Sequence, residues 1–218
     1  MLTLDRLCAS IAGKVVLRDV TTAFERGSTV ALVGRNGAGK TTLLRVIMGL
    51  LPRLSGNMSF EGADLGDVPA RDRARLGVGY APEDRVLFPT FSVEQNLRFP
   101  CEVTGHSRVQ TDARLEHTLA IVPELKTMLS RSAAALSGGQ GKMVALGRAI
   151  MAGEKMVLLD EPFQGLAPVL AAQYAESLNR LLKARPELCV VITESNRGLL
   201  KNIPARLLVL ERGELQAQ

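Results

Sequence analysis

Short continuous runs of hydrophobic residues recur along this chain, bounded by glycine, proline or polar residues. Four or five consecutive aliphatic or β-branched residues predict strands buried on both faces of a parallel sheet. Such runs occupy residues 29–33, 78–81, 156–159, 188–192 and 207–210. Residues 2–7 instead alternate between apolar and polar, which predicts an edge strand. Further strands are expected at residues 15–17 and 20–24, after a turn at Gly13.

Helices are expected between these strands, where apolar residues recur every three or four positions. We expect Ser92 to cap one of them and Pro100 to end it. Residues from about 84 to 150 are mostly helical in this interpretation, which predicts a helical insertion within a single domain of residues 1–218. Strands that alternate with helices in the C-terminal half predict an α/β fold with a mostly parallel central sheet. The expected helices cover residues 42–48, 93–99, 111–121, 138–152, 169–184 and 198–203.

Charge and cysteine content narrow the class of protein. The net charge is +5 and the pI is about 9.4, but the charged residues are scattered. We therefore expect a solvated surface, with contact to anionic lipid as the second interpretation. Three distant cysteines without a C-x-x-C pair indicate reduced thiols in a cytosolic protein. The start of the chain resembles no signal peptide, and no apolar run approaches the roughly 18 residues of a membrane span, so any membrane role is expected to come through partners.

A glycine-rich segment after the run at residues 29–33 fits G-x-x-x-x-G-K-[ST], the pattern of a phosphate-binding P-loop. Its glycines let backbone N–H groups turn towards phosphate oxygens, and the following helix adds the partial positive charge of its N-terminus. Lys40 is expected to reach the β- and γ-phosphates of ATP, and the Thr41 hydroxyl to bind Mg²⁺. The alternative is a strand-to-helix turn that binds nothing. The predicted nucleotide-binding residues here are Gly34, Arg35, Asn36, Gly37, Ala38, Gly39, Lys40, Thr41 and Thr42.

Two further segments carry candidate chemistry. Leu136-Ser137-Gly138-Gly139-Gln140 has the S-x-x-Q spacing of a helix capping box, but a glycine-rich helix start with a serine hydroxyl is also an anion site. Asp160 and Glu161 end the apolar run 156–159, at the sheet edge where ligands bind in α/β proteins. Solvated acids in a strand-end turn are the alternative, which the P-loop makes the weaker one.

The P-loop, Leu-Ser-Gly-Gly-Gln and an apolar strand ending in Asp-Glu, in this order, resemble the ATPase subunits of ABC transporters over nearly the whole chain. The resemblance implies a P-loop NTPase fold with an N-terminal antiparallel β subdomain. It implies that Asp160 holds Mg²⁺ through water and that Glu161 is the general base for the attacking water. Two such subunits dimerise head to tail, so the signature segment, Leu136–Gln140, would serve the partner's nucleotide, with Ser137 and Gly139 at its γ-phosphate.

The resemblance also implies partners and a location. ATP would close the dimer and hydrolysis would reopen it, and the helical insertion would carry this motion to two transmembrane permease subunits. A solute-binding protein would take part indirectly, and the chain would lie in the cytoplasm, peripheral on the cytoplasmic face of the inner membrane, without nucleic acid. An ABC ATPase acting on nucleic acid or ribosomes is an alternative. Such proteins usually carry paired domains or long coiled coils, whereas this chain has 218 residues and one P-loop.

Some segments resemble the second ATPase subunit of branched-chain amino-acid transporters in particular. They are residues 80–89, 92–97 and 164–168. Glu83 stands where ABC ATPases usually have a glutamine that contacts Mg²⁺, so it joins Thr41 and Asp160 as an expected metal ligand. The resemblance implies an importer of branched-chain amino acids or related small amides.

Other positions depart from the family pattern. Ser195 occupies the place of a catalytic histidine that contacts the γ-phosphate, and Ile11 replaces an aromatic residue that stacks on adenine. These departures, and Ala167 in place of a usual aspartate, favour a second hypothesis, in which this chain is a catalytically weak ATP-binding partner in a heterodimer. The intact P-loop lysine and the Asp-Glu pair oppose it. Gly141 stands where a basic residue or glutamine is common, and nothing in the sequence explains it.

Overall fold

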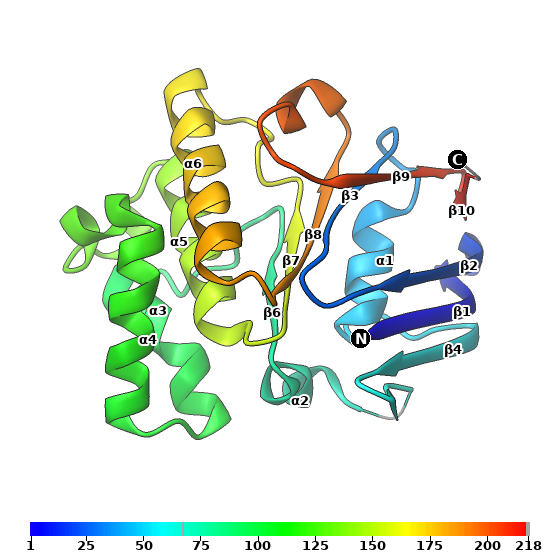
Figure 1. Ribbon diagram of the computed structural model, residues 1–218, viewed down its shortest axis with the longest axis horizontal. Coiled ribbons are helices and arrows are strands. Elements are labelled where there is room, and N and C mark those ends of the chain that lie inside the picture. Colours follow the sequence, from blue (N-terminus) through cyan, green and yellow to red (C-terminus); the bar gives the residue numbers. More distant parts are fainter. Residues whose placement is uncertain (67, 217–218) are drawn as a thin grey trace.

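The structure, a computed structural model, describes residues 1–66 and 68–216, and its strands form two sheets (Figure 1). The strands are β1 (Leu2–Ile11), β2 (Lys14–Phe24), β3 (Thr29–Val33), β4 (Ser55–Phe60), β5 (Ala63–Asp64), β6 (Val78–Ala81), β7 (Met156–Asp160), β8 (Cys189–Glu194), β9 (Arg206–Glu211) and β10 (Glu214–Leu215). An antiparallel sheet has the order β2-β1-β4-β5, and the central sheet has the order β10-β9-β3-β8-β7-β6. In the central sheet the strands from β9 to β6 are parallel, and β10 pairs antiparallel with β9. The α/β fold with a mostly parallel central sheet and an N-terminal antiparallel sheet is confirmed.

The helices cover the central sheet from both sides (Figure 1). The α-helices are α1 (Lys40–Ile47), α2 (Ala70–Arg73), α3 (Val93–Thr104), α4 (Arg108–Ile121), α5 (Gly138–Ala152) and α6 (Pro168–Ala184). The 3-10 helices are η1 (Ala74–Leu76), η2 (Pro123–Met128), η3 (Ala133–Ala135) and η4 (Arg197–Leu200). In the part of the chain that is described, no helix is both long and apolar enough to cross a membrane.

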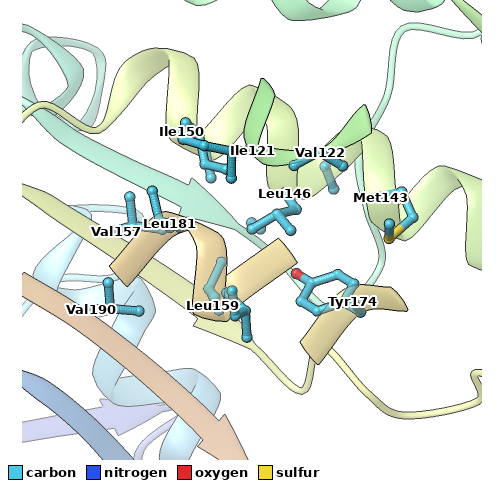
Figure 2. Packing of buried hydrophobic residues seen from close by; sticks show 14 of the residues in the cluster. Ile121, Val122, Met143, Leu146, Ile150, Val157, Leu159, Tyr174, Leu181 and Val190 are labelled. Atoms are coloured by element: carbon cyan, nitrogen blue, oxygen red, sulfur yellow. The ribbon is translucent and has the colours of Figure 1, made fainter. Parts of the chain in front are cut away.

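Each central strand buries side chains in two separate cores, because successive residues of a strand point to opposite faces. On β3, Val30 and Leu32 pack with α1 and the antiparallel sheet, whereas Ala31 and Val33 belong to the core under α5 and α6. Figure 2 shows the second core, in which Leu159 of β7 lies near Tyr174 of α6 and Leu146 of α5. Burial on both faces explains why these strands are continuous apolar runs in the sequence.

Two strand predictions are wrong in detail. Residues 2–7 were expected as an edge strand, but β1 lies between β2 and β4 in the antiparallel sheet. The expected strands at 15–17 and 20–24 are parts of one strand, β2, which forms a hairpin with β1. The register of this hairpin shifts along its length, and Asp19 has a φ of 45°. These irregularities interrupt the alternation of apolar and polar residues along β2, which is why the sequence pattern predicted two strands.

The prediction that Pro100 ends a helix is also wrong. Ser92 caps α3 as expected, through reciprocal hydrogen bonds with Gln95, but the helix continues to Thr104 with Pro100 inside it. Leu97 and Cys101, on either side of the proline, are buried in the core. Packing of this helix face therefore outweighs the lost backbone hydrogen bond.

Within residues 84–150, α5 differs from the helices before it, because it packs directly on the central sheet. Gly79 of β6 lies so close to this helix that a Cβ atom there would overlap the carbonyl oxygen of Ala149. The sheet thus fixes the position of α5, and through it the position of the signature segment at its start. The single domain and the helical subdomain at about 84–150 stay predictions.

Candidate functional site

The P-loop connects β3 to α1 in the strand–loop–helix arrangement that the sequence predicts. Gly39 precedes the helix with a φ of 109°, a backbone conformation that favours glycine. Gly34 passes so close to β9 that a Cβ atom would overlap the carbonyl oxygen of Leu210. The helix begins at Lys40, so the N–H groups of its first turn have no partner within the helix and are available to an anion.

A cavity of about 600 Å³ lies in front of this loop and is large enough for a small-molecule ligand. Ile11, at the end of β1, lines one part of it, and Glu83, after β6, lines another. The structure therefore brings residues from the antiparallel sheet and the central sheet to one place. The residues that line the cavity are Ile11, Ala12, Lys14, Val16, Asn36, Gly37, Gly39, Lys40, Thr41, Thr42, Glu83, Glu161 and Gln164.

Lys40 and Glu161 form a buried ion pair inside the site, with 3.0 Å between Nζ and Oε1. Lys40 is 4% exposed and Glu161 is 5% exposed. The ammonium group also donates hydrogen bonds to the carbonyl oxygens of Gly34 at 2.7 Å and Arg35 at 3.2 Å. Burial alone would raise the pKa of Glu161, but the hydrogen bond and charge of Lys40 outweigh it, so the pKa lies below its usual range. Glu161 is therefore a carboxylate when Lys40 faces it.

Asp160 lies at the centre of a hydroxyl network. Its Oδ1 accepts hydrogen bonds from the hydroxyls of Thr193 at 2.7 Å and Thr41 at 3.0 Å, and its Oδ2 accepts one from the Tyr80 hydroxyl at 3.2 Å. Burial raises the pKa of this carboxyl, against the effect of these hydrogen bonds. A nearby cation would stabilise the ionised form of such a buried carboxyl group.

The residues expected to hold Mg²⁺ suit a hard cation, because they offer hydroxyl and carboxylate oxygens. Thr41 already contacts Asp160, and Glu83 lines the same cavity as Thr41. The described residues include no group of three or more His, Cys, Asp or Glu side chains arranged to hold a metal ion. A magnesium ion here would be held by oxygens of Thr41, Glu83 and Asp160 together with oxygens from a ligand or water.

Ser195 contacts Glu161 from the other side. Its backbone N–H donates to Oε2 of Glu161 at 3.1 Å, and its hydroxyl donates to the same oxygen at 3.2 Å. The preceding residue, Glu194, is fully buried, and its Oε1 accepts a hydrogen bond from the N–H of Phe163 at 2.9 Å. Ser195, at the position where a histidine was expected, therefore binds the carboxylate of Glu161, the predicted base.

The signature segment does begin a helix, with the predicted capping box. Ser137 Oγ accepts from the N–H of Gln140 at 3.3 Å, and Gln140 Oε1 accepts from the N–H of Ser137 at 3.0 Å. Gly138 lines a second cavity of about 260 Å³, next to the first, because Glu83 and Gln164 line both. The start of α5 thus lines a cavity that neighbours the one in front of the P-loop.

The structure explains Gly141, which the sequence left unexplained. Gly141 is buried, and a Cβ atom there would lie 3.1 Å from Cδ of Arg85, which is tighter than an ordinary contact. Arg85 crosses this position and donates a hydrogen bond to the carbonyl oxygen of Gly138 at 3.3 Å. The glycine makes room for an arginine that contacts the start of α5.

Sequence reasoning missed several residues that contact the site, namely Tyr80, Lys142, Thr193 and Glu194. Tyr80 and Thr193 lie at the carboxyl ends of β6 and β8, the neighbours of β7. Their place at the same edge as Asp160 was a signal that could have found them, because ligands of α/β sheets bind there. Glu194 ends β8 and shared this signal, whereas Lys142, which lies within α5, did not.

Comparisons with known proteins agree with these features. Residues 17–164 match the ABC transporter family. The chain is 34% identical over 216 residues to a high-affinity branched-chain amino acid transport ATP-binding protein, BraG, of Pseudomonas aeruginosa, covering 99% of this chain and 91% of that protein. It is 32% identical to a lipopolysaccharide export system ATP-binding protein, LptB, of Escherichia coli, covering 99% and 89%. A solved ATP-binding subunit of an ABC transporter superposes with a TM-score of 0.86 at 28% identity, covering all of this chain and 88% of the other.

Proposed function

Because this chain belongs to the ABC transporter family, we propose that it powers an importer of branched-chain amino acids or related small amides. At the coarser level it is an ATP-binding ATPase subunit of a transporter. The likeness to a branched-chain amino acid transport protein over nearly the full length of both chains supports the substrate class. The observation that carries the activity is the buried pair of Lys40 and Glu161 between the P-loop and the end of β7.

The proposed mechanism begins from the Lys40–Glu161 pair. In the structure, the ammonium group of Lys40 is held by Glu161 and by two P-loop carbonyl oxygens. The phosphates of ATP would attract this ammonium group, which would release the carboxylate of Glu161 to accept a proton from the attacking water. Ser195 would keep the carboxylate in place through its two hydrogen bonds. Glu161 is the proposed general base, and Lys40 the proposed phosphate ligand.

Mg²⁺ is part of the proposal. Thr41, Glu83 and Asp160 would hold it, and the ion would neutralise charge on the phosphates when bound. The remaining P-loop residues would bind phosphates through their backbone, and Ile11 would make an apolar contact with adenine. The signature segment, Leu136–Gln140, would serve the nucleotide of a partner ATPase.

The proposed partners are a second ABC ATPase subunit and two transmembrane permease subunits, with a solute-binding protein acting on the permeases. The chain would lie on the cytoplasmic face of the inner membrane. A different cargo is the second candidate, because LptB, a lipopolysaccharide export protein, covers this chain at nearly the same identity as BraG. Ser195, bound to Glu161 in place of a free histidine, also keeps open the weak-partner hypothesis for this chain's own site.

An uptake experiment separates these possibilities. Cells would carry either the wild-type chain or Lys40→Ala at the native locus, and uptake of labelled leucine, isoleucine and valine would be measured. We expect the variant to lose most of this uptake. Lys183→Met, which alters an exposed lysine of α6, is the matched control and should leave uptake unchanged. If uptake of all three amino acids is the same with Lys40→Ala as with wild type, the substrate class is wrong, whatever the ATPase activity.

A further inference from the structure

The backbone of Glu161 adopts a conformation that few residues other than glycine adopt. Its φ is 44°, in the left-handed region. A strained residue of this kind persists only where its surroundings hold it in place. Glu161 begins the turn that leads from β7 to α6, so the strain lies at the residue that we propose as the general base.

Three groups hold this backbone from two sides. The N–H of Glu161 donates to the hydroxyl of Thr193 on β8 at 3.0 Å. Its carbonyl oxygen accepts from the ammonium group of Lys142 at 2.6 Å and from the N–H of Gln164 at 3.2 Å. Lys142 comes from α5 and Thr193 from β8, so a helix and a strand that are distant in sequence hold the two peptide units that flank the Cα atom of Glu161.

We propose that Lys142 is a positioning residue, whose ammonium group fixes the backbone of Glu161 so that the carboxylate points into the nucleotide cavity. The direction of a side chain follows from its backbone, and here the two carboxylate oxygens meet Lys40 at 3.0 Å and the Ser195 hydroxyl at 3.2 Å. The inference rests on the role of Glu161 proposed above. It also ties that residue to the helix that starts at the signature segment, because Lys142 lies in the second turn of α5.

The carbonyl oxygen of Glu161 has a second donor besides Lys142. Burial lowers the pKa of this ammonium group, although the nearby acidic groups of Glu194, Glu83 and Glu161 act in the opposite direction. Keeping the charge buried therefore costs stability. Without Lys142, the carbonyl oxygen of Glu161 still accepts from Gln164, so no buried acceptor is left without a partner. The buried ammonium group of Lys142 thus costs stability, although the carbonyl oxygen that it contacts already has another donor. This combination indicates a role of Lys142 in activity.

The test uses Lys142→Met, which keeps the length of the side chain and removes its charge. Single-turnover hydrolysis of labelled ATP, with the full-length protein in excess, measures slow rates, and calorimetry measures ATP affinity. Loss of a charged hydrogen bond that acts through the base should lower the rate by about tenfold or more. The Kd for ATP should change by less than about twofold, and the urea midpoint should be unchanged or higher.

Three other variants make the result decisive. Lys183→Met is the matched control and should behave as wild type. Lys142→Gln replaces Lys142→Met if that protein does not fold, and the same rate loss is expected because glutamine is too short and uncharged. Wild-type rates in the position-142 variant, or a rate loss accompanied by weaker ATP binding and a lower urea midpoint, would overturn the inference. If Glu161→Gln hydrolyses ATP normally, the proposed base is wrong; if it is inactive while Lys142→Met is normal, only the inference on Lys142 fails.

Discussion

Glu194 gives the structure its sharpest prediction on stability. The side chain is fully buried, with a relative accessibility of 0%. Its Oε2 has no hydrogen-bond partner among the described residues. Burial, with the negative charge of Glu161 adding to it, raises the pKa of Glu194 from 4.5 to about 8, although the N–H of Phe163 and the charge of Lys142 act against the shift. Glu194 is therefore protonated in the folded protein at a pH where the unfolded chain has lost this proton.

The sign of the pH dependence follows from this difference in bound protons. Between pH 4.5 and about 8 the native state holds one proton more than the unfolded state at Glu194, so the free energy of unfolding falls as the pH rises. A whole proton corresponds to about 1.4 kcal/mol per pH unit. From about pH 5.5 to about pH 7.5 this residue alone should cost about 2 to 3 kcal/mol of stability, a large share of the roughly 5–15 kcal/mol typical of domains.

The perturbation is Glu194→Gln, which keeps the shape and removes the titrating proton. Its amide oxygen can still accept from Phe163, and its NH₂ group stays neutral at every pH of the experiment. Urea unfolding at a series of pH values should show equal stability of the two proteins near the acid end. The variant should then become the more stable protein as the pH rises towards 8.

A control variant and one contrary outcome complete the test of Glu194. Glu187→Gln, which alters an exposed acid just before β8, is the control and should give a curve parallel to wild type. Parallel curves for wild type and Glu194→Gln across the same range would refute the argument, because they would mean that Glu194 is already ionised in the folded protein.

Other variants test the site itself. Lys40→Ala should weaken ATP binding by about tenfold or more, because it removes the charge that faces the phosphates, and equal Kd values by calorimetry would contradict the P-loop assignment. Glu161→Gln should lower turnover by about 10²-fold or more in the assembled complex and trap an ATP-bound dimer; unchanged phosphate release would show that this site does not hydrolyse. Ser137→Arg should abolish the rate gain on adding a partner ATPase, since it blocks the start of α5, and an intact gain would count against a shared nucleotide. Gly141→Leu should lower stability by about 1–3 kcal/mol, because it displaces Arg85, and an unchanged urea midpoint would show that Arg85 moves freely.

The sequence by itself determined the features that depend on neighbouring residues. The buried strands were visible because a strand covered on both faces is an apolar run, as at residues 29–33 and 188–192. The P-loop and the capping box at Ser137 and Gln140 were visible because their hydrogen bonds and backbone conformations are set within a few positions of the chain. Local chemistry therefore sufficed for the fold class and for the conformation of the P-loop segment.

Only the tertiary structure decided features that join distant parts of the chain. The edge-strand prediction for β1 was wrong because a partner on its second side, β4, begins more than forty residues later. Pro100 does not end α3, because packing of the helix face sets its length more strongly than one lost hydrogen bond. Lys142 belongs to no local pattern, and Glu194 shows only that a strand ends there; their contacts form where α5 and β8 meet the turn after β7. Burial and charge at that meeting point depend on how the layers pack, which no short stretch of sequence specifies.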